Sequence, residues 1–333
     1  MRLPLTSTSS SLSSEAGASQ PASAPRAGRS PAARQSPFGW AAGMAAPWLL
    51  LAPALVPLAV LVLVPYVGAL LYSLTDARLT NLTEPTLVGA GNFAAVVASR
   101  QPPFWLVVEA TIVFTLGTVL GSLGLGTGLA VALHSLKPSW RGPLLALFLV
   151  PWVIAGVVIG YTWKLVYDPQ IGLANTLLGL LGLAGVGWLL DRWVAIASLV
   201  VANVWAAYGV VLLIVSSALA NVPRNIVLAA QSDGAGMATI VRRIILPSIR
   251  PAVLLATLVA FISGLSVFDL IFVLTGGGPV YQTETLALMM YRLSFKRGDV
   301  GEGAAVTVIL FAFSVLLAVA YVITWQREAR KWS

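Results

Sequence analysis

The sequence predicts an all-α integral membrane protein with six transmembrane helices. Hydrophobic residues make up 58% of the 333-residue chain, against roughly 45–50% in a soluble domain. Charged residues make up only 10%, where a soluble domain has roughly 25%. Six mostly apolar stretches are also long enough to cross a bilayer, which takes about 20 residues in a helix.

The composition excludes several kinds of site. The chain has no cysteine, which excludes disulfides and thiol chemistry, and its single histidine, His134, excludes a cluster of histidine metal ligands. The formal net charge is +8, but arginine and lysine in a membrane protein mark cytoplasmic loops. We therefore expect membrane lipid, and no nucleic acid, around this chain.

Residues 1–40 predict a disordered cytoplasmic tail. This stretch is rich in Ser, Ala and Pro and lacks apolar periodicity. It carries four arginines against one acid, Glu15, a composition that also fits an organelle transit peptide. A cleaved signal peptide fits less well, because the first apolar stretch begins late and spans about 30 residues, where a signal core has about 7–15. Residues 41–333 predict one six-helix membrane domain.

The six spans follow one another with short loops between them. We expect them over residues 45–74, 105–133, 143–164, 193–219, 252–274 and 303–325. The first contains four prolines, at positions 47, 53, 57 and 65, and we expect it to be kinked or broken.

The second span contains a run of glycines. Gly117 and Gly121 have small-xxx-small spacing, and glycines at 124, 126 and 128 follow. The run looks like a nucleotide-binding loop but follows no strand, so we interpret it as a surface for close helix packing.

Lysine and arginine in the loops predict the orientation. With the N-terminus inside, the inside segments hold 13 basic residues, which are Arg2, Arg26, Arg29, Arg34, Lys137, Arg141, Arg224, Arg242, Arg243, Arg250, Arg327, Arg330 and Lys331. The outside segments and span edges hold seven, which are Arg78, Arg100, Lys164, Arg192, Arg292, Lys296 and Arg297. We therefore expect both termini on the cytoplasmic side.

The loop over 220–250 holds all but the last residue of the stretch AAQSDGAGMATIVRRIILPSIRP, which runs from Ala229 to Pro251. A seventh span is excluded, because each of its three arginines would cost about 2.5–3.5 kcal/mol near the bilayer centre. We expect two short cytoplasmic helices instead. The first starts at Pro223 with Asn221 as its cap, and Gly234 ends it in the left-handed conformation.

The second short helix starts near Gly236, and we expect Pro247 and Pro251 to break the chain after it. Its apolar face consists of Met237, Ile240, Val241, Ile244 and Ile245. The corner between the two helices presents small residues, which fit a groove of another protein. An amphipathic helix lying in the lipid headgroups is the equal alternative.

The same stretch resembles the EAA loop of ABC-transporter permeases, whose pattern is roughly EAA-x-x-DGA followed by I-x-LP. The matching residues are Ala229, Ala230, Asp233, Gly234, Ala235, Ile244, Leu246 and Pro247. The resemblance implies that these residues form a coupling loop, which seats in a cleft of a separate ATPase subunit present in two copies. Leu228 stands where the pattern has glutamate, which removes a charge contact made by some members.

Further stretches resemble carbohydrate permeases of the maltose/glycerol-phosphate type. They are LVGAGNF before span two, LVPWVIAGVVIGYTWKLVYDPQIGLANTLL around span three, and LTGGGP with TETL after span five. The resemblance covers about residues 45–326 and implies the MetI-like fold of type I ABC importer permeases in a bacterial inner membrane. It also implies a sugar, oligosaccharide or sugar-like polyol phosphate as cargo, a second homologous permease, and an extracytoplasmic sugar-binding protein.

The chain carries no recognisable ATP site. It has no GxxxxGK[ST] motif, and none of its four lysines follows a glycine. We expect no cofactor, no metal and no catalytic residue in this chain, with ATP bound by the partner ATPase.

Eight residues are candidates for the substrate pathway. Asp269 lies about six positions from the outer end of span five, where its carboxylate either binds sugar hydroxyls or makes a structural hydrogen bond to a neighbouring helix. The interior residues that could join it, by hydrogen bonding or by stacking rings on sugar faces, are Asn203, Ser263, Ser266, Trp152, Trp205 and Tyr208. The resemblance implies sugar contacts at Trp152, Gly156 and the Ser266–Asp269 region, whereas Trp163 and Trp188 are typical of an interfacial belt.

Two other functions fit the sequence less well. A secondary solute transporter would show inverted repeats and paired carboxylates, but the sequence shows no repeat, and Asp269 is the only acid deep in a span. An intramembrane enzyme would need an acid–base or metal pair, and His134 stands alone at a loop edge.

Overall fold

The computed structural model describes the backbone of residues 38–329 and the side chains of 51–223 and 225–326. The named elements in this part are all helical, with only isolated β-bridges beside them. The predicted tail over 1–40 lies outside the described residues except for 38–40, which begin a helix. The chain divides into two units at Leu58, and the features below belong to the unit Ala59–Ser333, apart from the first part of α1.

Within residues 38–329, five helices are long and apolar enough to cross a membrane, and a bent helix pair makes a possible sixth. The long helices are α1 (Phe38–Ser73), α3 (Phe104–Ser135), α7 (Arg192–Ala220), the continuous run of α9 (Met237–Ile240), η1 (Val241–Ile245) and α10 (Leu246–Leu265), and α13 (Val300–Ala329). The shorter ones are α2 (Gly91–Val97), α6 (Leu173–Leu180), α8 (Arg224–Ser232), α11 (Asp269–Leu274), α12 (Leu286–Tyr291) and η2 (Arg292–Lys296). Spans one, two, four and six are thus close to their predicted positions.

Helix α1 is continuous through its four prolines, so of the two expected outcomes, a kink or a break, the break does not occur. Each proline removes a single i→i−4 hydrogen bond, and the ladder continues on both sides of it along 36 residues.

Predicted span three is not one helix. Helices α4 (Pro138–Val153) and α5 (Gly156–Val166) meet at an angle of 91°. The Ile154 N–H closes α4 by bonding to the Pro151 carbonyl at 3.4 Å. Ile154 and Ala155 then have extended backbones that redirect the chain. Hydropathy did not reveal this break, because both residues at it are apolar.

Predicted span five differs at both ends. The chain does not break at Pro247 and Pro251, because one helical run extends from Met237 to Leu265. A proline ring clashes with the carbonyl of residue i−4 in an α-helix, and for Pro247 that residue lies inside the π-helical turn Val241–Ile245, which is wider. The run then ends at Leu265, and α11 starts only at Asp269.

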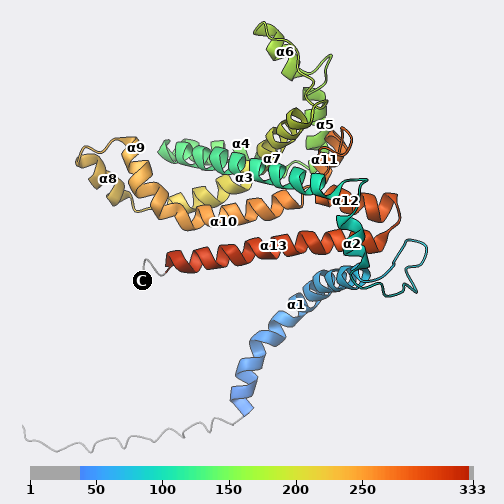
Figure 1. Cartoon of the computed structure of the whole chain (residues 1–333). Coiled ribbons are helices and arrows are strands. Elements are labelled where there is room, and N and C mark those ends of the chain that lie inside the picture. The colour runs from blue at the N-terminus through green and yellow to red at the C-terminus, as the bar shows by residue number, and fades with distance from the viewer. Residues whose placement is uncertain (1–37, 330–333) are drawn as a thin grey trace, which may run out of the picture. The chain divides into compact units, whose positions relative to one another are not determined.

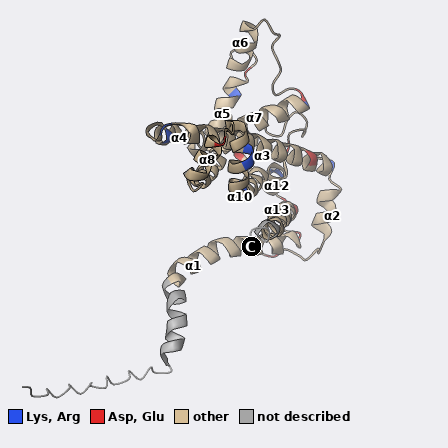
Figure 2. Cartoon of the chain, turned by 90° about the vertical axis from the view of Figure 1, so that its left-hand side faces the viewer, with Lys and Arg blue, Asp and Glu red and all other residues tan. Residues whose placement is uncertain are grey.

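Helices α3, α7 and α10 lie side by side (Figure 1). A methyl group added to Gly117 would lie 3.0 Å from Val200, and one added to Gly121 would lie 2.5 Å from Val204. Gly117 and Gly121 therefore serve close packing of α3 against α7, as predicted, whereas a methyl group on Gly124 or Gly128 would meet nothing within 4 Å. The ribbons in Figure 2 are almost entirely tan, which reflects how few charged residues these helices carry.

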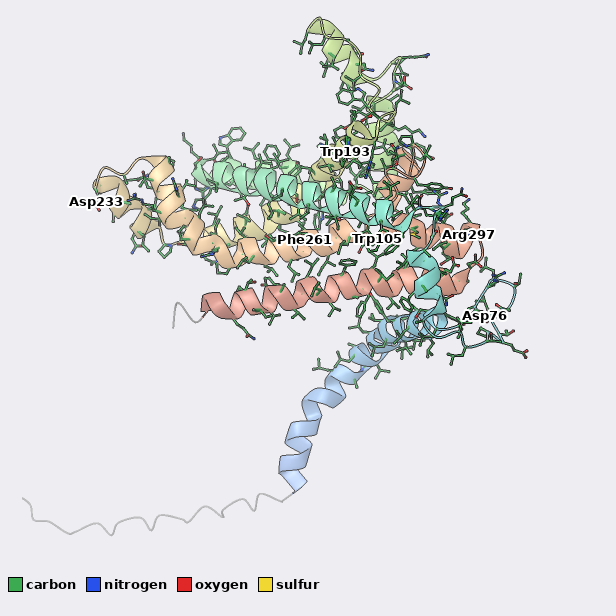
Figure 3. The ribbon with its side chains drawn as sticks, in the orientation of Figure 1. Asp76, Trp105, Trp193, Asp233, Phe261 and Arg297 are labelled. Atoms are coloured by element: carbon green, nitrogen blue, oxygen red, sulfur yellow. The ribbon has the colours of Figure 1, made fainter. Side chains whose placement is uncertain are left out.

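The unit Ala59–Ser333 has two distinct ends. Figure 3 shows Asp233, at the corner between α8 and α9, at one end of the long helices. Asp76 and Arg297 lie at the opposite end. The loop predicted to be cytoplasmic and two loops predicted to be outside are thus separated by the length of the helices.

We expect Gly126→Ala to lower the thermal midpoint of unfolding of the purified protein. The added methyl would lie 2.8 Å from Val211 Cβ and 2.9 Å from the Tyr208 carbonyl oxygen, and backbone cannot move aside cheaply. Overpacking of this kind costs about 1–3 kcal/mol. Gly124→Ala is the matched control, because its methyl meets nothing within 4 Å. Equal midpoints for the two variants would contradict the packing interpretation.

Candidate functional site

The two helix breaks face the same cavity. It has a volume of about 260 Å³, and five predicted pathway residues line it, namely Gly156, Asn203, Ser263, Ser266 and Asp269. Gly156 begins α5 directly after the first break, and Asp269 begins α11 directly after the second. The breaks thus bring together side chains from α5, α7, α10 and α11.

The three predicted aromatic residues lie outside the lining of this cavity. Trp152 is 46% exposed and packs its Cβ against Gly209. The ring of Trp205 meets Trp163 edge-on at 6.1 Å, and Tyr208 is buried in the core between α3 and α7. The helical periodicity of the sequence could not tell ring positions in the core from positions that line the cavity, because α7 packs against other helices on several sides.

A pair of glycines brings α5 and α11 together. A methyl group on Gly156 would lie 3.1 Å from Asp269 Cβ, and one on Gly160 would lie 2.8 Å from Val273 Cβ. The two contacts repeat at four-residue spacing on both helices, which is one turn of each. Gly156 therefore holds the Asp269 carboxylate against the start of α5.

The Asp269 carboxylate is exposed and has no hydrogen-bond or ion-pair partner among the residues that the structure describes. The structural bond to a neighbouring helix that the sequence left open is therefore absent within this part of the chain. The Ser266 hydroxyl donates to the Ile262 carbonyl at 3.0 Å, and the Asn203 amide donates to Thr118 Oγ1 at 3.3 Å. The cavity thus offers free acceptors, two carboxylate oxygens and one amide oxygen, to the hydroxyls of a ligand.

The second candidate site is the corner between α8 and α9. The Ala235 N–H donates to the Ala230 carbonyl at 2.9 Å, the Gly234 N–H donates to the Gln231 carbonyl at 3.0 Å, and Gly234 has φ +81°. This is a Schellman ending, which confirms the left-handed glycine. The cap expected from Asn221 is wrong, because its amide donates to the Ser217 carbonyl of α7 and Pro223 occupies the N-cap position.

The corner is fixed to the bundle by the apolar face of α9 and η1. Ile240 and Ile245 are buried among residues of α3 and α7, with Val241 and Ile244 half-buried beside them. Met237 does not belong to the buried face, because it is 55% exposed.

The residues that match the EAA pattern divide by exposure. Those exposed are Ala229, Asp233, Gly234, Leu246 and Pro247, and those half-buried are Ala230, Ala235 and Ile244. Ile226, Leu228 and Met237 add exposed apolar side chains. We call Ile226, Leu228, Ala229, Gly234 and Met237 the corner surface.

The sequence did not lead us to expect a buried ion pair between the loop after α11 and the start of η2. Glu284 is fully buried, and its carboxylate accepts from Arg292 Nε and Nη2, both at 2.8 Å. Arg292 also donates to the Gly276 carbonyl at 3.2 Å. A methyl group on Gly277, which has φ +87°, would lie 2.7 Å from Glu284 Oε2. Burial raises the pKa of Glu284, and the arginine partly opposes this. In the sequence, the sign of this pair was a glutamate and an arginine eight positions apart.

Comparisons with known proteins agree with this architecture. A family model described as "Binding-protein-dependent transport system inner membrane component" matches residues 40–328. The trehalose/maltose transport system permease protein MalF of Thermococcus litoralis is 31% identical over 274 residues, which cover 82% of this chain and 91% of that protein. The sulfoquinovosyl glycerol transport system permease protein SmoG of Agrobacterium fabrum is 30% identical over 82% of this chain and 88% of that protein.

A solved structure shares the fold. It is a bacterial alginate ABC transporter in complex with an alginate pentasaccharide-bound periplasmic protein. Its matching chain has a TM-score of 0.72 and 17% identity, and the match covers 85% of this chain and 94% of that one.

We expect Arg292→Gln to destabilise the protein far more than Arg78→Gln. The first variant leaves the buried Glu284 unpaired, and breaking a buried pair costs about 3–5 kcal/mol. Arg78 pairs with Asp299 at 3.2 Å but is 68% exposed, so water replaces its partner. Thermal unfolding of both variants measures the difference.

The loss in Arg292→Gln should also depend on pH. Burial raises the pKa of Glu284 and Arg292 lowers it, so removal of Arg292 leaves the effect of burial unopposed. The folded variant then holds the Glu284 proton more tightly than its unfolded chain does. Stability therefore falls as the pH rises above about 4.5, the ordinary value for glutamate, because only the unfolded chain then loses this proton readily. A pH-independent loss would contradict an unpaired buried carboxylate.

Proposed function

We propose that this chain, which belongs to the family of binding-protein-dependent transport system inner membrane components, passes a sugar or oligosaccharide across the bacterial plasma membrane. It is a membrane permease subunit and not an enzyme, and ATP is hydrolysed by a separate ATPase subunit present in two copies. A second homologous permease completes the pathway, and an extracytoplasmic sugar-binding protein delivers the cargo.

The cavity between the two helix breaks is the observation from which we infer the class of cargo. Its lining includes an unpaired carboxylate and an amide, and the residues that form it include no lysine or arginine. Such a site suits a neutral polyhydroxyl ligand better than a phosphate, so a sugar is favoured over a polyol phosphate. The names of relatives that mention trehalose and maltose support the same class.

We place both termini and the corner surface in the cytoplasm. The segments predicted to be inside hold 13 arginine and lysine residues, against seven in the segments and span edges predicted to be outside. An excess of these residues in short loops favours the cytoplasmic side. Arg242 and Arg243 lie close to the corner surface, which favours the same side for it.

The corner surface is the contact with the ATPase in this proposal. Its position at one end of the helices and its exposed apolar side chains fit a groove in a partner protein. Leu228, in place of the pattern's glutamate, is 56% exposed, and Ile226 two positions earlier is 48% exposed. The contact made by this subunit is therefore apolar where other members use a charge.

We expect Ala229→Asp to abolish uptake and to release the ATPase during purification of the assembled importer, with the chain itself still inserted. The new carboxylate would have to be desolvated in the groove. Asn221→Asp is the control, because the same charge is added at an exposed position outside the corner surface. Retention of the ATPase and normal uptake in Ala229→Asp would rule out this contact.

We expect Asp269→Asn to keep assembly and stimulated ATPase activity while reducing sugar uptake at least tenfold. The amide keeps the shape but loses one acceptor and the charge, and a hydrogen bond to a charged group is worth about 1.5–3 kcal/mol. Uptake of labelled sugar, ATPase rate and complex yield are the measurements. Normal uptake with Asp269→Asn together with a low yield with Asp269→Leu would make Asp269 a structural residue.

A further inference from the structure

The segment between α5 and α7 forms an uncharged hairpin. Residues 169–190, here called the arm, contain no charged side chain, and Asp168 and Asp191 flank them. The arm includes α6 and projects away from the bundled helices (Figure 1). Asn175 closes it, because its amide donates to the Val186 carbonyl at 3.2 Å and its oxygen accepts from the Val186 N–H at 3.0 Å. The arm is therefore a defined structure and not a loose loop.

The surface of the arm is unsuited to water. Leu180 and Leu181 at its tip are 79% and 75% exposed. Contiguous exposed apolar patches mark contacts with protein or membrane. Part of the backbone at the tip is bonded internally, since the N–H groups of Leu181 and Leu183 both donate to the Leu178 carbonyl. Residues 184 and 185, on the return of the arm, lie outside helices and donate to no backbone group of the described residues, so this side of the arm needs water or lipid headgroups.

A cavity of about 570 Å³ lies between the arm, α5 and α7. Its lining includes Trp163, Tyr167, Leu177, Trp188 and Val201. A volume of this size holds a small ligand.

The polar groups around this cavity are largely bonded to one another. The Tyr167 hydroxyl donates to the Ser198 carbonyl, the Ser198 hydroxyl donates to the Trp188 carbonyl, and the Trp188 indole donates to Asn175. A sugar would find few free partners here, whereas a hydrocarbon chain needs none.

We propose that the arm lies at the boundary between headgroups and hydrocarbon in the leaflet on the side of the Glu284 loop, with the leucines of its tip in the hydrocarbon, and that its cavity holds an acyl chain of a phospholipid. The two flanking acids set the depth, because each carboxylate accepts from backbone N–H groups at the base of the arm. Asp168 accepts from the N–H groups of Ile171 and Gln170, which lowers its pKa, and Asp191 accepts from those of Trp193 and Val194. Trp193, two residues after Asp191, is 53% exposed and suits the membrane interface, where indole rings are enriched. This inference rests on the membrane location of the chain and is independent of its cargo.

Spin labels can test the depth of the arm in the assembled importer reconstituted in phosphatidylethanolamine–phosphatidylglycerol bilayers. The chain has no cysteine, so Leu180→Cys and Val280→Cys each give one label on this subunit. The two positions are equally exposed, at 79% and 80%. We expect oxygen, which concentrates in hydrocarbon, to relax the label at 180 at least threefold more than a water-soluble nickel chelate does, with the reverse order at 280. Strong relaxation by the chelate at 180 would put the arm in water, and relaxation by neither reagent would mean that protein covers it. Both outcomes overturn the proposal.

Native mass spectrometry of the importer tests the cavity. Ala197 lines it and is exposed, so Ala197→Phe fills the space without disturbing the core. Ala132→Phe adds the same ring at another exposed position, on α3. We expect Ala197→Phe to retain one phosphatidylglycerol fewer than the wild type, and Ala132→Phe to retain the same number. Equal retention by all three proteins would exclude a bound acyl chain in the cavity.

Discussion

Close packing of helix α7 is the contact on which the rest of the structure depends. In lipid there is no hydrophobic drive to bring helices together, so close approach of their backbones has to supply the attraction. Gly117, Gly121 and Gly126 allow α3 to reach the surface of α7, and Gly209 of α7 itself admits Trp152 from α4. Helices α5, α10 and α11 also contact α7. The cavity and the corner surface are therefore both positioned by one helix.

The two helix breaks have a physical cost that the cavity helps to explain. A helix interrupted in a membrane leaves N–H and C=O groups without intrahelical partners, which is tolerated only against protein or water. Here both interruptions open onto the same space, with Gly156 on one side and Asp269 on the other. The close contact of α5 and α11 at Gly160 and Val273 holds the two helix breaks next to each other. A polar site thus occurs where regular structure ends.

Hydropathy was sufficient to predict most of the spans, because length and apolar composition alone identify a membrane helix. It could not find the break at Ile154 and Ala155, where both residues are apolar. Nor could it foresee that a π turn lets the chain pass Pro247, because proline on its own indicates a helix end. The sequence predicted the polar cavity residues through their types, but the rings of Trp205 and Tyr208 lie elsewhere, since burial on α7 depends on neighbours that are distant in sequence. The Glu284–Arg292 pair was likewise hidden, because its burial arises from the fold of the loop.

The uninterrupted helix from Met237 to Leu265 connects the corner surface to the cavity. Its 29 residues follow about 43 Å of helix axis at about 1.5 Å per residue. The axis changes direction between α9 and α10 in Figure 1, but the helix does not stop there, because the π turn carries the chain past Pro247. Movement of the corner surface is therefore passed along continuous helix to Ser263 and Ser266 at the cavity. The geometry of this single helix can therefore turn a small rocking movement at the cytoplasmic face into the opening or closing of a passage on the other side.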